Sequence, residues 1–379
     1  MRILHINASY KPAYIYGGPT MSVSMLCEQL VKAGVSANVF TTTANGVNEL
    51  QVQTEKSVNI DGVEVTYFKR LTKDHTHFSP TLLAKLWKEA KKYDVIHIHA
   101  WWNLVSVLSC FIAVMRKVPV VVSARGTLSS YSFSNKNTGI KSLIHTLFGK
   151  SLLNRSHLHV TSKREKQAIL KVIQPKGISN IPNLVKLQAS HTSAEKETGP
   201  VLKLLFLSRI ENKKGLDILL NALPLVSVPY YLTIAGTGDE AYINDLKKLA
   251  TDNSITEKIN WVGFSDENKF DLLRTHDLFV LPSHDENFGN VVIESLSMGT
   301  AVLISKNVGL EDYVSKNNLG WLCETSPASV ADAINTIGTQ CEEDLKRISR
   351  EAPTVIYHDF DGNNLIKDYI AMYKEVINR

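Results

Sequence analysis

The sequence predicts an α/β protein built from two doubly wound domains with parallel sheets. Short runs rich in Val and Ile alternate with segments of helical periodicity along almost the whole chain. The alternation is interrupted once, by a polar stretch at residues 184–200, and then restarts. The length of 379 residues suits two domains of ordinary size.

The first half is expected to supply six strands. They are bounded by turn residues and are residues 2–7, 37–42, 63–68, 94–99, 118–124 and 157–162. Helical spacing of apolar residues follows each of the main strands, at residues 20–33, 80–92, 104–116, 140–154 and 163–172. Strands this rich in β-branched residues are typical of a parallel sheet that is covered on both faces. Residues 1–183 are therefore predicted to form the first domain.

The second half repeats this pattern. Its expected strands are residues 203–210, 230–236, 258–263, 277–283, 301–305 and 320–324. Its expected helices are residues 216–223, 240–251, 268–275, 290–298 and a final amphipathic helix at 359–378. We expect a linker at 184–200, a second domain at 201–356 and a separate C-terminal helical segment at 357–379.

The charge is divided unevenly between the halves. Residues 1–190 hold 24 Lys and Arg against 9 Asp and Glu, whereas residues 191–379 hold 18 against 28. A basic half suits a phosphorylated substrate, an anionic membrane or nucleic acid, or it is only a solvated surface. Nucleic-acid binding is the least favoured of these interpretations, because the basic residues are scattered and the sequence has no recognised nucleic-acid-binding motif.

The composition excludes several other classes. None of the four cysteines forms a C-x-x-C pair, so neither a zinc site nor a disulfide framework is indicated. The first ten residues are typical of a strand and not of a signal peptide, and the longest apolar run, 104–115, is too short to cross a bilayer. We therefore expect a cytoplasmic protein.

Candidate site residues of the first domain follow predicted strands, where ligands of doubly wound folds bind. Gly17 and Gly18 precede a helix and either let a phosphate approach the backbone or form a plain loop. His99 ends its strand and either reaches the site or is structural, while His97 lies deeper. Arg125 either binds an acceptor phosphate or anchors a loop.

The second domain has the more specific pattern. Arg209 and Lys214 are five positions apart across a turn, where they can clamp a diphosphate or supply ordinary charge at a helix start. Gly236, Thr237 and Gly238, with Gly263 and Phe264, end the next two strands and suit a flat base.

The segment 281–299, LPSHDENFGNVVIESLSMG, is the most informative part of the chain. Glu286 precedes the turn of Asn287, Phe288 and Gly289, and Glu294 lies eight positions later in the first turns of a helix. Carboxylates beside a helix N-terminus can grip paired sugar hydroxyls while the backbone N–H groups face an anion.

Together these motifs resemble glycosyltransferase family 4, which has the GT-B fold of two Rossmann-like domains facing across a cleft. The resemblance covers nearly the whole chain through the glycine pair, the HIH strand end, SR-x4-KG, IAGTGD, VGF, ENFG and E-x7-E. Two departures are Ser208, where many relatives have glycine, and the lack of a tryptophan at the start of the last helix. The resemblance also implies that this last helix packs back on the first domain.

The resemblance implies a retaining hexosyltransferase that uses a nucleotide sugar and needs neither a metal nor another cofactor. Gly17 and Gly18 would line the diphosphate, Arg209 and Lys214 would neutralise it, and His99 would lie near the anomeric centre. In the second domain, Glu286 would hold the donor sugar beside the backbone amides of Phe288 and Gly289. Glu294 would hold the ribose, and Gly263 and Phe264 would border the base. A UDP-linked donor is favoured over GDP or ADP.

The resemblance also points to the acceptor and the setting. The acceptor is expected to be a saccharide or a polyprenyl-diphosphate-linked saccharide in lipopolysaccharide O-antigen, capsule or exopolysaccharide synthesis, with contacts in variable loops such as 127–141. The lysines of helix 80–92 suggest peripheral docking at an anionic membrane, unless its Leu and Trp residues are core. The alternatives are a UDP-sugar epimerase, a phosphorylase or a non-catalytic nucleotide-sugar binder.

Overall fold

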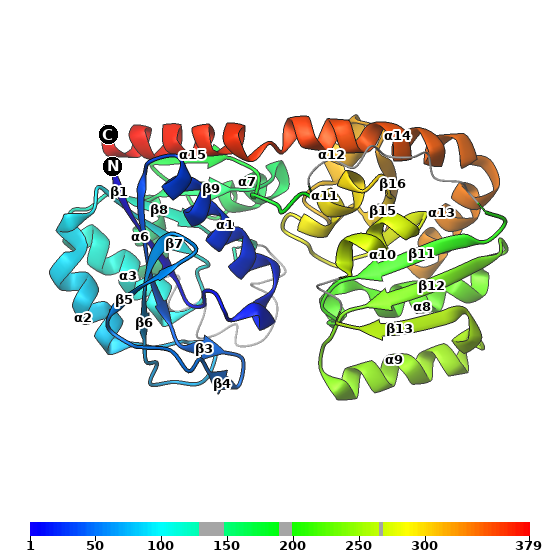
Figure 1. Ribbon diagram of the computed structural model, residues 1–379, viewed down its shortest axis with the longest axis horizontal. Helices are drawn as coiled ribbons and strands as arrows, with labels where there is room; N and C mark the ends of the chain where they lie inside the picture. The colour runs from blue at the N-terminus through cyan, green and yellow to red at the C-terminus, as the bar shows by residue number, and fades with distance from the viewer. Residues whose placement is uncertain (129–147, 189–198, 265–267) are drawn as a thin grey trace. The chain divides into compact units, whose positions relative to one another are not determined.

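The computed structural model describes residues 1–128, 148–188, 199–264 and 268–379 of the chain (Figure 1). These residues form two compact units. Unit 1 comprises Met1–Leu184 and Gly362–Arg379, and unit 2 comprises Val185–Asp361. The chain thus returns to unit 1 at Gly362, not at residue 357.

Unit 1 is built on an eight-stranded sheet. Its strands are β1 (Arg2–Asn7), β2 (Ser36–Thr42), β5 (Ser57–Ile60), β6 (Val63–Phe68), β7 (Val95–His99), β8 (Val120–Ser123), β9 (His157–Val160) and β10 (Gly177–Asn180). Their order is β10-β9-β8-β7-β1-β2-β6-β5, and every pair is parallel except β5 with β6. The two-residue strands β3 (Ala44–Asn45) and β4 (Asn48–Glu49) form a separate antiparallel pair.

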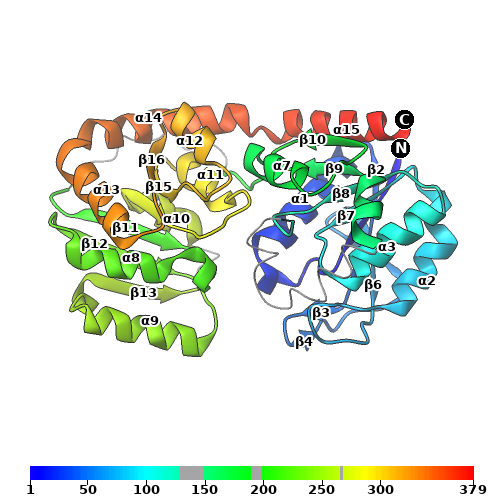
Figure 2. The same ribbon diagram turned by 180° about the vertical axis from the view of Figure 1, so that it is seen from behind.

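Helices cover both faces of this sheet, as the Val- and Ile-rich strands require. They are α1 (Gly18–Lys32), α2 (Pro80–Glu89), α3 (Leu104–Met115), α6 (Lys150–Asn154), α7 (Lys163–Leu170) and α15 (Gly362–Ile377). Buried residues of α1 and α15 share one core, and those of α2, α3, α6 and α7 share another. Figure 1 shows α15 alongside α1, and Figure 2 shows α2 and α3 from behind.

Unit 2 is built on a wholly parallel six-stranded sheet. Its strands are β11 (Leu202–Leu207), β12 (Tyr230–Ala235), β13 (Ile259–Gly263), β14 (Leu278–Leu281), β15 (Ala301–Ser305) and β16 (Gly320–Cys323). Its helices are α8 (Leu216–Ala222), α9 (Glu240–Asp252), α10 (Lys269–Thr275), α11 (Asn290–Ser297), α12 (Glu311–Lys316), α13 (Pro327–Gln340) and α14 (Glu342–Asp359). One continuous core joins the sheet to these helices.

The strand order of each unit marks where a ligand would bind. Unit 2 has the order β13-β12-β11-β14-β15-β16, and unit 1 has the same winding, reversing between β1 and β7. Ligands of such sheets lie outside the carboxyl ends of the strands at the reversal. In unit 2 the reversal lies between β11 and β14, so the segments after these strands are the place to look.

Candidate functional site

In unit 2, cations follow β11 and carboxylates follow β14. Lys213 and Lys214 belong to a single 3-10 turn, Asn212–Lys214, that leads into α8. The Lys214 ammonium forms an ion pair with the Glu286 carboxylate, and Lys213 Nζ lies 2.9 Å from Asp285 Oδ2. The structure thus brings together Lys214 and Glu286, which are 72 positions apart in the chain.

This pairing sets the charge of Glu286. Burial alone would raise the pKa of Glu286, but the adjacent Lys214 ammonium outweighs it, and the pKa is lowered. The carboxylate is therefore ionised at neutral pH. Backbone bonds hold the loop, since Glu286 N–H donates to Asn307 O at 3.0 Å and Gly309 N–H donates to Glu286 O at 2.8 Å. A fixed anion thus lies beside a fixed cation.

Arg209 lies on the same loop but is more open. Its side chain is 48% exposed and pairs with Glu211, two residues along the chain. An exposed pair of this kind is weak. The guanidinium can therefore exchange Glu211 for a ligand phosphate at little cost.

A glycine gives this loop its shape. Gly215 has a φ of 72°, which L side chains adopt rarely. A Cβ at this position would come within 2.2 Å of the Pro282 carbonyl oxygen. Gly215 therefore allows the turn carrying Lys214 to pack directly against the end of β14.

In the turn before α11, the Phe288 side chain and its backbone have different surroundings. The Phe288 ring is buried and lies 6.2 Å from the Phe360 ring, so it is part of the core. Gly289 has a φ of 93° and precedes the first residue of α11, Asn290. Only the backbone of Phe288 is left for the predicted ligand contact, while Asn287 is half-buried.

Glu294 is the most distinctive acid of the site. It is buried on α11, and its Oε1 accepts a hydrogen bond from Lys269 Nζ at 2.8 Å. Its second oxygen, Oε2, is also buried and has no hydrogen-bond partner among the described residues. A buried carboxylate oxygen without a donor costs free energy, so this atom suits hydroxyl groups of a ligand.

The glycines after β12 and β13 divide into two kinds. A Cβ at Gly236 would lie 1.8 Å from Ser208 O, and one at Gly238 would lie 2.0 Å from Ile210 O. These two glycines therefore serve the close approach of two backbone segments. Gly263 has a φ of 70° with open space beside it, and the Phe264 ring is 68% exposed. Among the described residues of these two loops, it is Gly263 and Phe264 that keep room for a flat base.

In unit 1, the glycine pair opens α1. Gly17 has a φ of 62° and is the N-cap, and Gly18 is the first helical residue. The first turn has no acidic residue, and no side chain caps it. Pro19 has no N–H, so the anion-binding donors of this turn are limited to the N–H groups of its other residues.

His99 is not at an open position in this structure, which supports the structural alternative for its side chain. Both His97 and His99 are fully buried at the end of β7. Burial and the nearby cation Arg125 lower the pKa of His99 well below its usual value, so the ring is neutral. Its predicted contact with a ligand stays a prediction that requires the ring to become accessible.

Arg125 anchors several elements of unit 1. Its guanidinium donates to Ser22 Oγ at 2.7 Å, to Asn183 Oδ1 at 3.2 Å and to His99 Nδ1 at 3.4 Å. The loop-anchor alternative therefore has direct support. The predicted acceptor loop 127–141 lies mostly outside the described residues.

Three histidines in unit 1 lie close enough to be considered as metal ligands. One ring nitrogen from each of His5, His97 and His99 lies within 4.8 Å of the others. However, His97 Nδ1 already bonds Tyr373 at 2.7 Å and its Nε2 bonds Ser123 at 2.6 Å. The neighbouring Arg125 would also repel a cation. We therefore read this cluster as a hydrogen-bond network.

Sequence reasoning missed Lys269 and Asp285 of unit 2. Lys269 is the first residue of α10, so only the fold brings its side chain to Glu294. Asp285 directly precedes Glu286 in the chain, so its position beside Glu286 is the signal that could have identified it. Within the ranges that the structure describes, no helix is long and apolar enough to span a membrane.

Two family profiles match consecutive parts of the chain. The profile described as Glycosyltransferase Family 4 matches residues 16–189, and the one described as Glycosyl transferases group 1 matches residues 190–355. An uncharacterized glycosyltransferase of Methanocaldococcus jannaschii, MJ1607, is 24% identical over 405 residues, covering 99% of this chain and 98% of that protein.

Solved structures show the same fold. Anabaena HepE, crystallised in complex with UDP-glucose, has a TM-score of 0.74 at 20% identity and covers 98% of this chain and 100% of its own. WaaG, a glycosyltransferase involved in lipopolysaccharide biosynthesis, has a TM-score of 0.70 at 14% identity and covers 95% of this chain and 97% of its own. These likenesses confirm the GT-B fold class expected from the sequence.

Proposed function

This chain belongs to the family 4, group 1 glycosyltransferases, and from that membership we propose that it transfers a hexose from a nucleotide sugar with retention of anomeric configuration. The observation that carries the proposal is the buried, unpartnered Oε2 of Glu294. That oxygen would accept hydrogen bonds from the ribose hydroxyls, while Lys269 holds the other oxygen. A UDP-linked donor is the favoured one, supported by the fold that the chain shares with a protein crystallised with UDP-glucose.

Lys214 and Glu286 would contact different parts of the donor when it binds. Lys214 and Arg209 would face the diphosphate, and Glu286 would accept hydrogen bonds from hydroxyls of the sugar. Fixed cations placed where leaving-group charge develops lower the barrier. We propose that these two cations make a metal ion unnecessary and that no other cofactor takes part.

The transfer itself would take place on one face of the sugar. The bond between the anomeric carbon and the diphosphate oxygen breaks, and a bond to the acceptor hydroxyl oxygen forms on the same face. The acceptor proton passes to the departing diphosphate. No side chain is assigned as a nucleophile, and Glu286 is not proposed as one because its carboxylate is paired with Lys214.

The acceptor would be a saccharide or a polyprenyl-diphosphate-linked saccharide used in cell-surface polysaccharide synthesis. Arg125 is retained as a proposed acceptor contact, and Gly17 and Gly18 as proposed diphosphate contacts. The fold shared with WaaG supports a role in polysaccharide synthesis, and we propose a cytoplasmic location.

Peripheral membrane docking would use the outer face of α2. Leu82 and Leu86 are core residues, but Trp87 is 44% exposed beside the exposed Lys88. Basic residues near an anionic surface contribute about 1 kcal/mol each. Co-sedimentation with anionic vesicles at low salt tests this docking, and loss of pelleting in Trp87→Ala would support this face of α2.

A thermal-shift panel tests the donor site. UDP, GDP, ADP and their sugars would be compared in the presence of EDTA on wild type, Glu294→Ala and the exposed control Glu343→Ala. Ligand at about 100 times its dissociation constant stabilises a fold by about 2.7 kcal/mol. We expect a shift for the UDP series that Glu294→Ala loses and Glu343→Ala keeps.

If none of the nucleotides shifts the melting temperature, the proposed donor site and the proposed transfer reaction are both contradicted. A shift with donor turnover that needs no acceptor would instead favour an epimerase. Binding without any turnover would favour a non-catalytic binder.

A further inference from the structure

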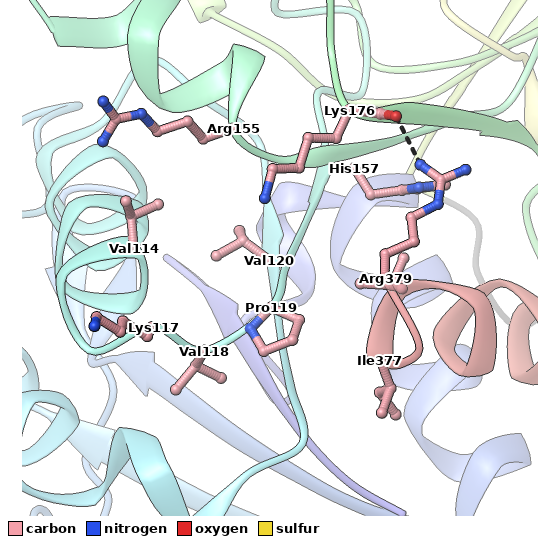
Figure 3. Close-up of a pocket in the computed structure, with 11 residues that line it drawn as sticks. Val114, Lys117, Val118, Pro119, Val120, Arg155, His157, Lys176, Ile377 and Arg379 are labelled. Carbon is pink, nitrogen blue, oxygen red and sulfur yellow. Dashed lines mark hydrogen bonds between the residues drawn. The ribbon is translucent and has the colours of Figure 1, made fainter.

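A cavity lies in unit 1, at the opposite end of the strands from the predicted site of that unit. Its volume is about 330 Å³, and it lies where β8, β9 and β10 begin (Figure 3). One part of its lining is apolar, consisting of Val114, Val118, Pro119, Val120, Val376 and Ile377. The other part is cationic, consisting of Lys117, Arg155, Lys176 and Arg379. None of the residues that line it is acidic.

The positive charge of this cavity is poorly compensated. Arg379 pairs with Glu375 on α15 and donates from Nη1 to the Lys176 carbonyl at 2.6 Å, as Figure 3 shows. Over the described residues, Lys117, Arg155 and Lys176 have no carboxylate within ion-pair distance. Like charges gathered around a concave surface raise the local concentration of anions.

One of the residues that line the cavity has a buried polar atom without a partner among the described residues. His157 is 4% exposed and shares a hydrogen bond of 2.8 Å between Nε2 and Ser179 Oγ. Its Nδ1 is buried, with no partner among the described residues. A Cβ at Gly177 would lie 2.3 Å from Arg379 Nη1 and 2.6 Å from His157 Nδ1. The lack of a side chain at 177 therefore lets the guanidinium and the imidazole come together here.

An apolar stripe leads away from the cavity along α3. Val114 lines the cavity, and Phe111, three residues before it, is its neighbour on the helix surface. Met115 is four residues after Phe111 and lies on the same side of the helix as Phe111. Phe111 and Met115 are 42% and 56% exposed. A ligand held in the cavity can therefore extend an apolar portion over this stripe.

We propose that this cavity is a second binding site, for an organic phosphate that carries an apolar group. The cations would hold the phosphate through charge-assisted hydrogen bonds, and the valines, Pro119 and Ile377 would cover the apolar part. The site lies at the amino ends of the strands, so it is separate from the proposed donor site. The proposal goes beyond sugar transfer and does not depend on it.

Hexyl phosphate is a suitable probe, with inorganic phosphate and hexanol as partial probes, measured by calorimetry on the full chain. We expect hexyl phosphate to bind more tightly than either partial probe. Arg155→Gln/Lys176→Gln should weaken it about tenfold for each charge removed. The control Lys56→Gln/Lys73→Gln makes the same charge change at exposed positions of unit 1 and should bind as wild type does.

No binding of hexyl phosphate to wild type, or equal affinity in the cavity double variant, would overturn the proposal. Vesicles with and without phosphatidic acid distinguish the source of the phosphate. If wild type pellets with vesicles that contain phosphatidic acid and the cavity double variant does not, the ligand is a lipid. If the double variant pellets as wild type does but no longer binds hexyl phosphate, the ligand is a soluble phosphate. The thermal shift with UDP should be the same in both double variants. A negative result for the cavity can therefore be distinguished from a negative result for the donor site.

Discussion

Lys214 is the single residue from which we expect the largest catalytic effect. Its ammonium pairs with Glu286 in the structure and is proposed to face the leaving diphosphate. Lys214→Gln should lower kcat roughly 10²- to 10³-fold, the cost of removing one preorganised group that stabilises developing charge. Steady-state release of the nucleoside diphosphate measures it. Lys316→Gln, at an exposed position of the same unit, should keep wild-type kcat. A fall of less than threefold in Lys214→Gln would remove Lys214 from the mechanism.

Gly215 offers a test of backbone shape with a matched control. Gly215 and Gly263 have φ values of 72° and 70°, but a Cβ meets the Pro282 carbonyl oxygen at 2.2 Å only at Gly215. Gly263→Ala should lower the free energy of unfolding by about 1 kcal/mol, the cost of left-handed backbone alone. Gly215→Ala should lower it by about 3 kcal/mol or more, because the clash adds to that cost. Urea unfolding of unit 2 measures both, and equal losses would contradict this account.

At the residue scale, sequence reasoning found which residues follow the strands but not what they touch. The glycines and Arg209, Lys214 and Glu286 could be named, because βα loops of this fold are identifiable from alternation. The burial of His99 and the Lys269 contact to Glu294 could not, because each depends on elements distant in the sequence. The surroundings of a side chain are set by tertiary packing, and the spacing of residues in the sequence carries no information about that packing.

At the scale of elements, α15 is held to the sheet of unit 1 by a directed chain of hydrogen bonds. The Ile181 carbonyl can only accept, so His159 Nε2 donates to it at 2.9 Å and His159 Nδ1 accepts from Ser123 at 2.6 Å. Ser123 Oγ therefore accepts from His97 Nε2–H at 2.6 Å. His97 Nδ1 in turn accepts from the Tyr373 hydroxyl at 2.7 Å. The chain thus couples α15 to β7, β8 and β9.

Tyr373→Phe tests this coupling. The ring and its packing remain, but the buried His97 Nδ1 loses its donor. The free energy of unfolding of unit 1 should fall by about 1–3 kcal/mol, the cost of a buried unsatisfied acceptor. Tyr14→Phe, at a side chain that is 53% exposed, should change it by less than about 0.5 kcal/mol. Chemical denaturation followed by circular dichroism measures both, and an unchanged midpoint for Tyr373→Phe would contradict the directed chain.

Most elements could be predicted from the sequence, and the misses have physical reasons. Strands such as β1 and β15 match their predicted ranges residue for residue, because their apolar runs end sharply at turn residues. β10, with the sequence GISN, has one large apolar residue, so only its pairing with β9 identifies it. α14 is not among the predicted helices. It contains Pro353, a residue type that usually ends a helix, yet the helix continues with Pro353 buried.

At the scale of the whole molecule, the buried histidines of unit 1 make its free energy of unfolding depend on pH in the acid range. Burial lowers the pKa of His5 and of His159 from an ordinary 6.5 to about 3, and lowers those of His97 and His99 well below 6.5. The facing charged and titratable groups are Arg125 after β8, His157 on β9, and Tyr369 and Tyr373 on α15. The cation Arg125 reinforces the depression, so the folded unit keeps these four rings neutral.

The unfolded chain binds protons at these histidines below about pH 6.5, whereas the folded chain does not. The stability that they contribute is therefore complete above pH 6.5 and is lost as the pH falls, at up to about 1.4 kcal/mol per pH unit for each ring. Urea unfolding between pH 7 and pH 5, where ordinary carboxylates stay ionised, should show the free energy of unfolding of unit 1 falling steeply. The ring proton resonances of the four histidines should keep neutral positions until the unit unfolds. A flat free energy over this range, or resonances that titrate in the folded state, would show that these rings are accessible to protons, and the neutral hydrogen-bond network would have to be abandoned.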